Sequence, residues 1–222
     1  MCGRFTQMMT WEELVELLGP ISQQVPIPHA RYNIAPSSQI LVTKSESSQK
    51  TLTTMPWGVK PEWSKRLIIN AQAEKYTGQG HSFWKSWQRC LIPTSGFYEW
   101  KVTHAGKEPT FIRLKEEKHF AIGGLYRGFE YGGVMVDMTV ILTTKPNELM
   151  TDIHHRMPVI VARQDHQKWL SRSSSSHEIG PCVAPFPAEK MEAWAVGHLV
   201  DNARNDRPEC MTPANSEITR DD

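Results

Sequence analysis

The second residue of the chain is a cysteine, in a position that allows chemistry unavailable to an internal cysteine. The chain begins Met1-Cys2-Gly3-Arg4. Initiator methionine is removed when the next side chain is small, so we expect Cys2 to become the N-terminal residue. An α-amine has a pKa of about 7.7–8.0, so a useful fraction of it is neutral and nucleophilic at physiological pH. The mature chain would then carry an amine and a thiol on adjacent carbons.

Such an aminothiol captures aldehydes. The amine forms a reversible imine, and the thiol then closes a far more persistent five-membered thiazolidine ring. Gly3 allows close approach of another chain, and Arg4 is a cation able to hold an anion or lower the pKa of the thiol. Two alternatives stay open here. Cys2 could be the thiol nucleophile of an amidase with its own amine as base, or simply a small apolar side chain.

Two further segments contain groups suited to proton transfer. Glu99 lies among aromatic residues in Gly96–Trp100, where desolvation would raise its pKa; the alternative is a strand glutamate on a solvated face. His154 and His155 precede Met157-Pro158, and the proline disfavours a helix. In an extended segment the two rings alternate, so one of them at most faces a given site.

A lone amide, Asn70, ends the apolar run Ile68–Ile69. Such an amide either satisfies buried backbone groups or points into a site. The chain has no His-x-x-x-His, no Cys-x-x-Cys and no acidic triplet, so we predict no metal site and no cofactor.

Tryptophans and cations alternate over residues 57–89, a pattern that resembles single-strand binding, where aromatic rings stack on bases and cations hold phosphates. We expect most of these tryptophans to be core and Trp63, in a polar loop, to be exposed. The residues concerned are Trp57, Lys60, Trp63, Lys65, Arg66, Trp84, Lys85, Trp87 and Arg89.

The elements that position these groups are mostly strands. Thr10 and Glu13 form a capping box that begins a helix, and Gly19-Pro20 ends it. Gly132-Gly133 predicts a tight hairpin turn. Strands are predicted over 39–43, 51–56, 110–114, 119–125, 134–142 and 159–162, helices over 163–170 and 188–196, and loops over 31–36 and 171–176.

The fold class is therefore α+β: a single domain over residues 1–222, with a mainly antiparallel, β-barrel-like sheet flanked by a few short helices. The net charge of +1 provides no global attraction for a polyanion, so nucleic-acid binding requires a local basic patch. No apolar run approaches the roughly 20 residues of a membrane helix. We expect no secretory signal peptide, because residues 1–7 have no basic region leading into an apolar segment. We expect a cytoplasmic chain with reduced cysteines, no membrane association and no obligate protein partner.

Taken together, several blocks resemble the SRAP (SOS-response-associated peptidase) family. They are Met1–Phe5, Tyr32–Pro36, Trp57-Gly58, Ile69–Ala71 with Glu74, Cys90–Pro93, Gly96–Trp100, Ile153–Pro158 and Asn202–Asn205, in family order. The resemblance implies a cleft for single-stranded DNA containing abasic sites, ending at Cys2, and association with the nucleoid when DNA is bound. An abasic site opens to an aldehyde, which is the electrophile that the aminothiol requires.

The resemblance also implies roles for individual residues. Cys2 would form the thiazolidine cross-link, Asn70 would hold it and the opened sugar, and Glu99 and His154 would act as acid–base groups. DNA would be bound by Arg4, Asn33, Pro36, Trp63, Thr143 and Arg156, of which the two arginines would contact phosphates and Trp63 and Pro36 would wedge or stack against bases. Strand cleavage by β-elimination and self-catalysed removal of Met1 would be further activities.

Some positions depart from the family pattern. Gln72 stands where arginine is usual, so that one phosphate contact is lost or is supplied by Lys60, Lys65 or Arg66. His155 replaces a usual aspartate, and Ala195–Gly197 replaces Pro-Val-Ser. Neither change touches the chemistry expected of Cys2.

Overall fold

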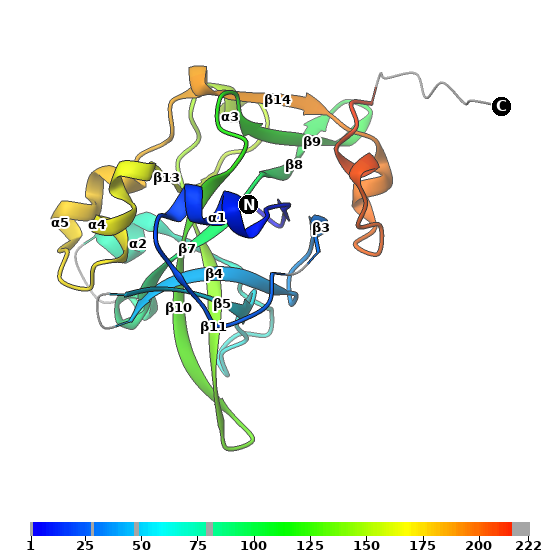
Figure 1. The fold of residues 1–222 in the computed structure, drawn as a ribbon. Coiled ribbons are helices and arrows are strands. Elements are labelled where there is room, and N and C mark those ends of the chain that lie inside the picture. Colours follow the sequence, from blue (N-terminus) through cyan, green and yellow to red (C-terminus); the bar gives the residue numbers. More distant parts are fainter. Residues whose placement is uncertain (1, 28, 47–48, 79–81, 215–222) are drawn as a thin grey trace.

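The structure, a computed structural model, describes residues 2–27, 29–46, 49–78 and 82–214. Its strands form two sheets (Figure 1). The smaller sheet has the order β14-β9-β8-β1-β3. Its members are β1 (Arg4–Gln7), β3 (Arg31–Ile34), β8 (Gly96–Thr103), β9 (Gly106–Leu114) and β14 (Met191–Ala195).

The larger sheet follows the path β12-β11-β10-β7-β4-β5-β2, with β13 paired to β10 and β6 paired to β11. Its strands are β2 (Ser22–Gln23), β4 (Gln39–Glu46), β5 (Gln49–Pro56), β6 (Asn70–Gln72), β7 (Gln88–Thr94), β10 (Phe120–Tyr131), β11 (Val134–Thr144), β12 (Met157–Pro158) and β13 (Ile160–Val161). All its pairs are antiparallel except β11 with β6 and β2 with β5.

The helices are short and lie around the sheets. The α-helices are α1 (Trp11–Leu18), α2 (Ala73–Thr77), α3 (Glu148–Thr151), α4 (His166–Leu170) and α5 (Ser176–Ile179). The 3-10 helices are η1 (Phe83–Ser86), η2 (Arg163–Asp165), η3 (Gly180–Val183), η4 (Ala188–Lys190), η5 (His198–Asp201) and η6 (Pro208–Met211). Within the described ranges no helix is long and apolar enough to cross a membrane.

The predicted α+β class with mainly antiparallel sheets is confirmed, but the expected barrel-like closure is not found among the described strands. The two sheets are separate because β1, β3, β8, β9 and β14 pair with one another rather than with the larger sheet. Both sheets therefore have open ends, at β14 and β3 and at β12 and β2.

Local signals at the first helix and at the long hairpin are confirmed. The Thr10 hydroxyl accepts from the Glu13 amide at 3.3 Å, and the Glu13 carboxylate accepts from the Thr10 amide at 2.9 Å. Gly132 and Gly133 have φ of 58° and 81°, values that glycine adopts without a Cβ clash. This turn joins β10 to β11 in a hairpin that projects from the body of the molecule (Figure 1).

Two sequence predictions were wrong. Residues 188–196 form η4 and strand β14 rather than a helix, because β14 pairs with β9 from Met191↔Leu114 to Ala195↔Thr110. Residues 31–34 form β3 rather than a loop, because they pair with β1. In both cases a neighbouring strand offers hydrogen bonds that local pattern does not reveal.

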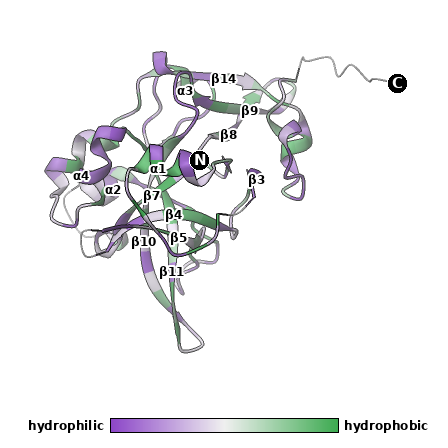
Figure 2. Cartoon of the chain, viewed as in Figure 1, coloured by the Kyte–Doolittle hydropathy of each residue, from purple (hydrophilic) through white to green (hydrophobic). Residues whose placement is uncertain are grey.

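The core lies in clusters between and around the sheets. One contains Cys2, Phe5 and Trp57, with Phe5 and Trp57 in edge-to-face contact at 5.1 Å between ring centroids. Another lies beneath α1 and includes Leu14, Leu17 and Leu18. In Figure 2 the hydrophobic colour follows β4 and β7, while α4 is largely hydrophilic. Residue 2 is thus built into the core.

Candidate active site around Cys2

Cys2 lies two residues before Arg4, the first residue of β1, which is an inner strand of the smaller sheet, between β8 and β3. Its side chain is fully buried, and its Sγ lies 4.0 Å from the carbonyl oxygen of Arg4. Burial, and after it the negative charge of Glu99, raises the pKa of the thiol well above its usual value. At neutral pH the sulfur is therefore a protonated thiol rather than a thiolate.

Glu99 is on β8, directly after Tyr98, which pairs with Arg4 of β1. Only 3% of the residue is exposed, so the alternative of a solvated strand face does not hold. Burial raises the pKa of its carboxyl to about 7, against the opposing charge of the amino terminus. Both protonation states of Glu99 are thus populated near neutral pH.

Asn70 begins β6 and reaches the same place from the larger sheet. Its Nδ2 donates to the carbonyl oxygen of Cys2 at 3.0 Å. Its Oδ1 is buried and has no hydrogen-bond partner among the described residues. The sequence left two roles open for this amide, to satisfy a buried backbone group or to point into a site. Its nitrogen satisfies the backbone carbonyl of Cys2, and its oxygen is an acceptor available at the site.

His154 follows α3 and is partly buried. Its Nδ1 lies 3.1 Å from the backbone nitrogen of Arg156 and 3.2 Å from the carbonyl oxygen of the same residue, so the tautomer decides which of the two hydrogen bonds forms. Burial, and then the charge of the amino terminus, lowers the pKa of His154, so the ring is neutral at pH 7. Its ring stacks on that of the exposed His155, with centroids 4.2 Å apart.

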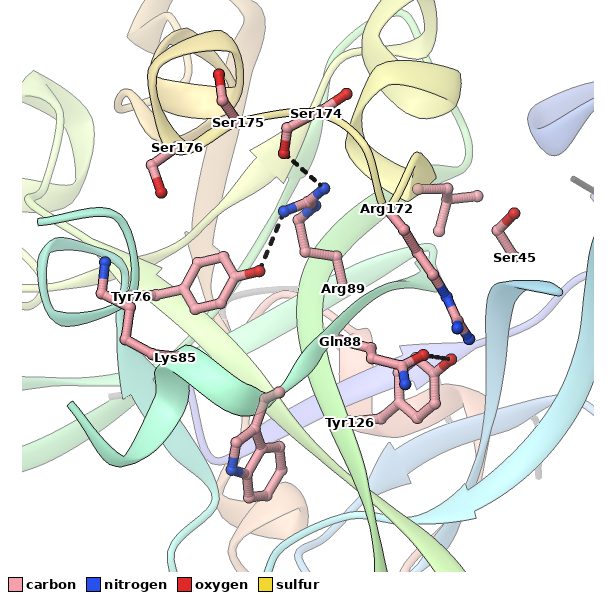
Figure 3. Close-up of a pocket in the computed structure, with 12 residues that line it drawn as sticks. Ser45, Tyr76, Lys85, Gln88, Arg89, Tyr126, Arg172, Ser174, Ser175 and Ser176 are labelled. Atoms are coloured by element: carbon pink, nitrogen blue, oxygen red, sulfur yellow. Dashed lines mark hydrogen bonds between the residues drawn. The ribbon is translucent and has the colours of Figure 1, made fainter. Parts of the chain in front are cut away.

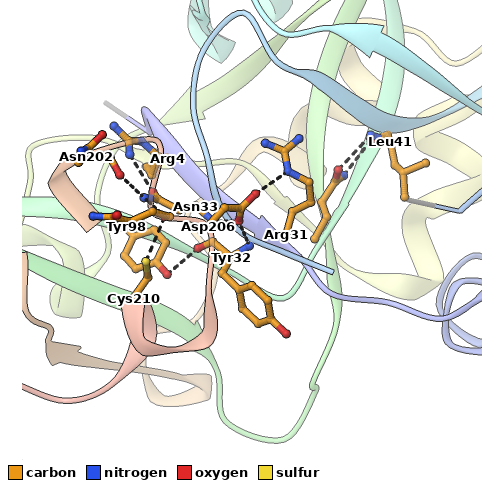
Figure 4. Close-up of polar contacts among 11 residues, drawn as sticks. Arg4, Arg31, Tyr32, Asn33, Leu41, Tyr98, Asn202, Asp206 and Cys210 are labelled. Atoms are coloured by element: carbon orange, nitrogen blue, oxygen red, sulfur yellow. Dashed lines mark hydrogen bonds and ion pairs between the residues drawn. The ribbon is translucent and has the colours of Figure 1, made fainter. Parts of the chain in front are cut away.

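Arg4 and Asn33, both predicted to bind DNA, contact each other and the C-terminal segment (Figure 4). Arg4 Nη1 donates to Asn33 Oδ1 at 2.7 Å and to the carbonyl of Val200 at 2.8 Å. Asn33 Nδ2 is shared among the carbonyls of Val200, Asn202 and Asn205, at 2.7–3.1 Å. The two side chains therefore fix residues 200–205 beside the start of β1.

Asp206 completes this network and was not singled out from the sequence. Its carboxylate accepts from the amides of Tyr32 and Asn33 at 2.5 and 2.9 Å and pairs with Arg31 Nε at 2.8 Å (Figure 4). It holds β3 to the segment that follows η5. Only the neighbouring block Asn202–Asn205, which ends one residue before Asp206, pointed to this part of the sequence.

Arg156 and Thr143 lie beside each other at the edge of the site. Arg156 makes a two-bond ion pair with Glu74, at 2.9 and 2.8 Å, and also donates to the carbonyl of Thr143. The Thr143 hydroxyl donates to the carbonyl of Ala71 at 3.3 Å. A phosphate bound by Arg156 would share this guanidinium with Glu74.

Trp63 and Pro36 are on the surface. Trp63 is 66% exposed, as predicted, and contacts Phe83 edge-to-face at 5.3 Å. Trp57, Trp84 and Trp87 are buried, also as predicted. Pro36 is half-buried in a turn whose next residue, Ser37, has φ of 72° and donates from its amide to the carbonyl of Trp57.

The arrangement suits acid–base chemistry at the start of the chain. Cys2 ahead of β1, Asn70 from β6 and Glu99 from β8 converge there, and the pKa of His154 responds to the charge of the amino terminus. The site combines a half-titrated carboxyl, a neutral imidazole and an amide oxygen around a buried thiol. This set can donate protons to a bound molecule and accept them from it.

Comparison with known proteins identifies the class of protein that this fold and site define. The family model for SOS response associated peptidase (SRAP) matches residues 1–203. The chain belongs to this family.

Similar proteins come from several bacteria. Abasic site processing protein YoqW of Bacillus subtilis is 38% identical over 95% of this chain and 99% of its own. Abasic site processing protein YedK of Escherichia coli is 30% identical over 96% of this chain and all of its own. A crystal structure of a protein from Bacteroides thetaiotaomicron superposes with a TM-score of 0.82, covering 96% of this chain and 100% of that chain at 25% identity.

Proposed function

We propose that this chain captures abasic sites in single-stranded DNA as a thiazolidine formed with the α-amine and thiol of Cys2, after removal of Met1. The observation that carries the proposal is the convergence of Asn70 and Glu99 on a buried residue 2. The names of the similar bacterial proteins, abasic site processing proteins, support the choice of electrophile.

The first step joins the amine to the opened sugar. The neutral α-amine of Cys2 attacks the aldehyde carbon to give a carbinolamine, which loses water to become an imine. Loss of water requires a proton on the departing hydroxyl, and Glu99, with its pKa raised by burial to about 7, is suited to donate it. The Oδ1 of Asn70, buried without a partner among the described residues, is suited to accept from the amine or a sugar hydroxyl.

The second step closes the ring. The sulfur of Cys2 bonds to the imine carbon while its proton is transferred, through a neighbouring base, to the imine nitrogen. Because burial raises the pKa of the thiol, the sulfur does not compete as a thiolate for the first attack. The amine acts first and the thiol makes the adduct durable.

Two further activities belong to the same proposal. β-Elimination from the imine would cleave the DNA strand before the ring closes. Self-catalysed removal of Met1 would expose the amine, with Glu99 or His154 managing the proton.

An amidase or peptidase with a Cys2 thiol nucleophile is the second candidate. That chemistry requires a thiolate, or a base able to make one. The raised pKa of the Cys2 thiol argues against it, and no contact of the described residues favours it over aldehyde capture.

The test combines intact mass with cross-linking to an oligonucleotide that contains one abasic site. The mature wild-type chain should lack Met1 and give a heat-stable adduct on a denaturing gel. Cys2→Ser should form an imine that borohydride traps but no durable ring, and a chain that retains Met1 should form neither. A heat-stable adduct from Cys2→Ala would refute the proposal. Glutamine or peptide turnover without a DNA adduct would favour the amidase.

A further inference from the structure

A second polar region lies away from Cys2, between the α4–α5 connection and the larger sheet. It consists of two adjoining cavities of about 390 and 740 Å³, which share Ser45, Leu170 and Arg172 in their walls. We call the two together the basic groove. Figure 3 shows Ser174, Ser175 and Ser176 on one side of the smaller cavity and Gln88 and Tyr126 on the other.

The basic groove has a strong charge bias. Its walls contain the four cations Lys50, Lys85, Arg89 and Arg172, and none of the described residues that line it is an aspartate or glutamate. Six serines add hydroxyl groups, namely Ser45, Ser171, Ser173, Ser174, Ser175 and Ser176. A chain with a net charge of only +1 therefore concentrates positive charge here.

Another cavity of similar size shows that this bias is not general. The cavity of about 480 Å³ beside the start of α1 is lined by four glutamates, Glu13, Glu16, Glu116 and Glu117, as well as by cations. The basic groove thus differs in composition from a comparable hollow in the same molecule.

Arg89 is the best-fixed cation of the groove. Its Nε donates to the carbonyl of Trp169 at 2.6 Å, its Nη1 donates to the Tyr76 hydroxyl at 3.1 Å, and its Nη2 donates to the carbonyls of Ser171 and Ser174. All these acceptors are neutral. The guanidinium is held rigidly while its charge has no carboxylate partner in these contacts, which favours an anion nearby.

The other cations follow the same pattern. Lys50 donates to the carbonyl of Leu18, and Lys85 donates to the carbonyl of Gly78. Arg172 is exposed, and the carboxylate that responds to its charge, Glu46, is already paired with Lys44 at 2.8 Å. Lys50 and Lys85 therefore donate to neutral carbonyl oxygens, and the carboxylate that senses Arg172 is already shared with Lys44.

Helix α2 connects the groove to the Cys2 site. It begins at Ala73, shortly after Asn70, and Tyr76 near its end lines the groove. Six residues separate Asn70 from Tyr76, which limits the distance between them to about 20 Å. One extended strand of nucleic acid can therefore reach both places.

We propose that the basic groove binds phosphodiester groups of the single-stranded DNA, at nucleotides beyond the one captured by Cys2. This inference rests on the proposed function. Cations and serine hydroxyls without carboxylates are what a phosphate backbone requires, and the size of the groove suits more than one phosphate. It also gives a role to Lys85 and Arg89, two cations of the pattern that suggested single-strand binding.

The test is the salt dependence of binding to a lesion-free single strand of about 16 nucleotides, measured by fluorescence anisotropy. Each phosphate contact on a single strand contributes about 0.7 to the slope of log K against log salt. The double variant Arg172→Ala/Lys85→Ala should reduce the slope by about 1.4 relative to wild type. The control Arg113→Ala/Lys107→Ala removes the same charge from β9 in the other sheet and should leave the slope unchanged.

Equal slopes for the double variant and the control would overturn the inference. If the double variant fails to fold, Arg172→Gln alone, at an exposed position, should lower the slope by about 0.7. Thermal stabilisation of the wild type by inorganic phosphate, with no difference in DNA slope between the variants, would assign the groove to a small anion and also refute it.

A second measurement separates this inference from the proposed function. An abasic dinucleotide, in which the lesion has a single neighbouring nucleotide, cannot extend from Cys2 to the groove and should cross-link equally fast to wild type and to the double variant. A longer one should cross-link more slowly to the double variant at physiological salt. Absence of any adduct with the wild type would refute capture by Cys2 while leaving the slope test of the groove intact.

Discussion

At the scale of residues, Glu99 shows how burial makes a single carboxyl suited to proton transfer near neutral pH. The residue is almost fully buried on a central strand, and burial brings its pKa to about 7, close to that expected for a terminal α-amine. The proposed reaction needs the amine neutral and the carboxyl protonated at the same time. The two requirements oppose each other as pH changes.

This opposition predicts a bell-shaped pH profile for adduct formation by the mature chain. The rate should rise as the amine loses its proton, reach a maximum between about pH 7 and 8, and fall as Glu99 ionises. Glu99→Gln should lose the alkaline decline and slow the reaction about 100-fold or more, because an amide cannot donate the proton. Single-turnover cross-linking over a series of pH values measures both.

Glu108→Gln, at an exposed position of β9, is the matched control and should keep both limbs of the profile. An undiminished alkaline decline in Glu99→Gln would show that another group is the acid.

Residue order indicated the candidate groups of this site but not their contacts. The aminothiol of Cys2 and an aromatic setting for Glu99 follow from residue order. The partners of Arg4 and Asn33 do not, because Val200, Asn202 and Asp206 are some 170 to 196 positions away along the chain. Long-range pairing of this kind is set by the whole fold and leaves no local pattern.

At the scale of elements, β8 is the strand on which the position of Glu99 depends. It pairs with β1 on one side and β9 on the other, and it begins at Gly96. A Cβ at Gly96 would overlap the ring of Phe111 and lie 2.9 Å from the carbonyl oxygen of Ile112. The close packing of the two strands requires glycine at this point.

Gly96→Ala should therefore destabilise the fold by about 1–3 kcal/mol, because the β8–β9 pair must separate to admit the methyl group. Chemical denaturation measures the loss. Gly180→Ala, where an added Cβ meets no atom within 4 Å, is the control and should change the stability little. Equal stability of the two variants would mean that β8 and β9 adjust without cost.

The elements that sequence reasoning identified are those with strong local signals. The capping box of α1 and the Gly132-Gly133 turn are of this kind. Strand β14 was mistaken for a helix because Met191–Ala195 has good helix formers, and its strand conformation comes from pairing with β9. The barrel-like closure was wrong for a related reason, since pairing among distant strands decides how many sheets form.

At the scale of the whole molecule, the buried carboxyl of Glu99 has a cost in stability. Its pKa is near 4.5 in the unfolded chain and about 7 in the folded one, so the folded state binds more protons between these values. Stability contributed by protonated Glu99 is full below the lower value and is lost as pH rises through about 7. The loss at pH 8 is about 3 kcal/mol.

Glu99→Gln should consequently be more stable than wild type at about pH 8 and nearly equal to it at about pH 4, while it is impaired in capture. Thermal unfolding at the two pH values measures this. Glu74→Gln is the control, and its stability should change in the opposite direction. The ion pair with Arg156 lowers the pKa of Glu74, so losing this ion pair should reduce the stability at the higher pH. A Glu99→Gln protein less stable than wild type at about pH 8 would contradict the assignment.

The place of β1 between β8 and β3 has a practical consequence for anyone who produces this protein. An affinity tag fused ahead of Met1 would leave Cys2 without a free α-amine. Because residue 2 is buried beside Asn70, the tag would also have to leave the core at this point. If capture proceeds as proposed, preparations purified with an uncleaved leader would form no adduct with abasic DNA. A handle at the other end of the chain, or one released to leave cysteine first, avoids this false negative.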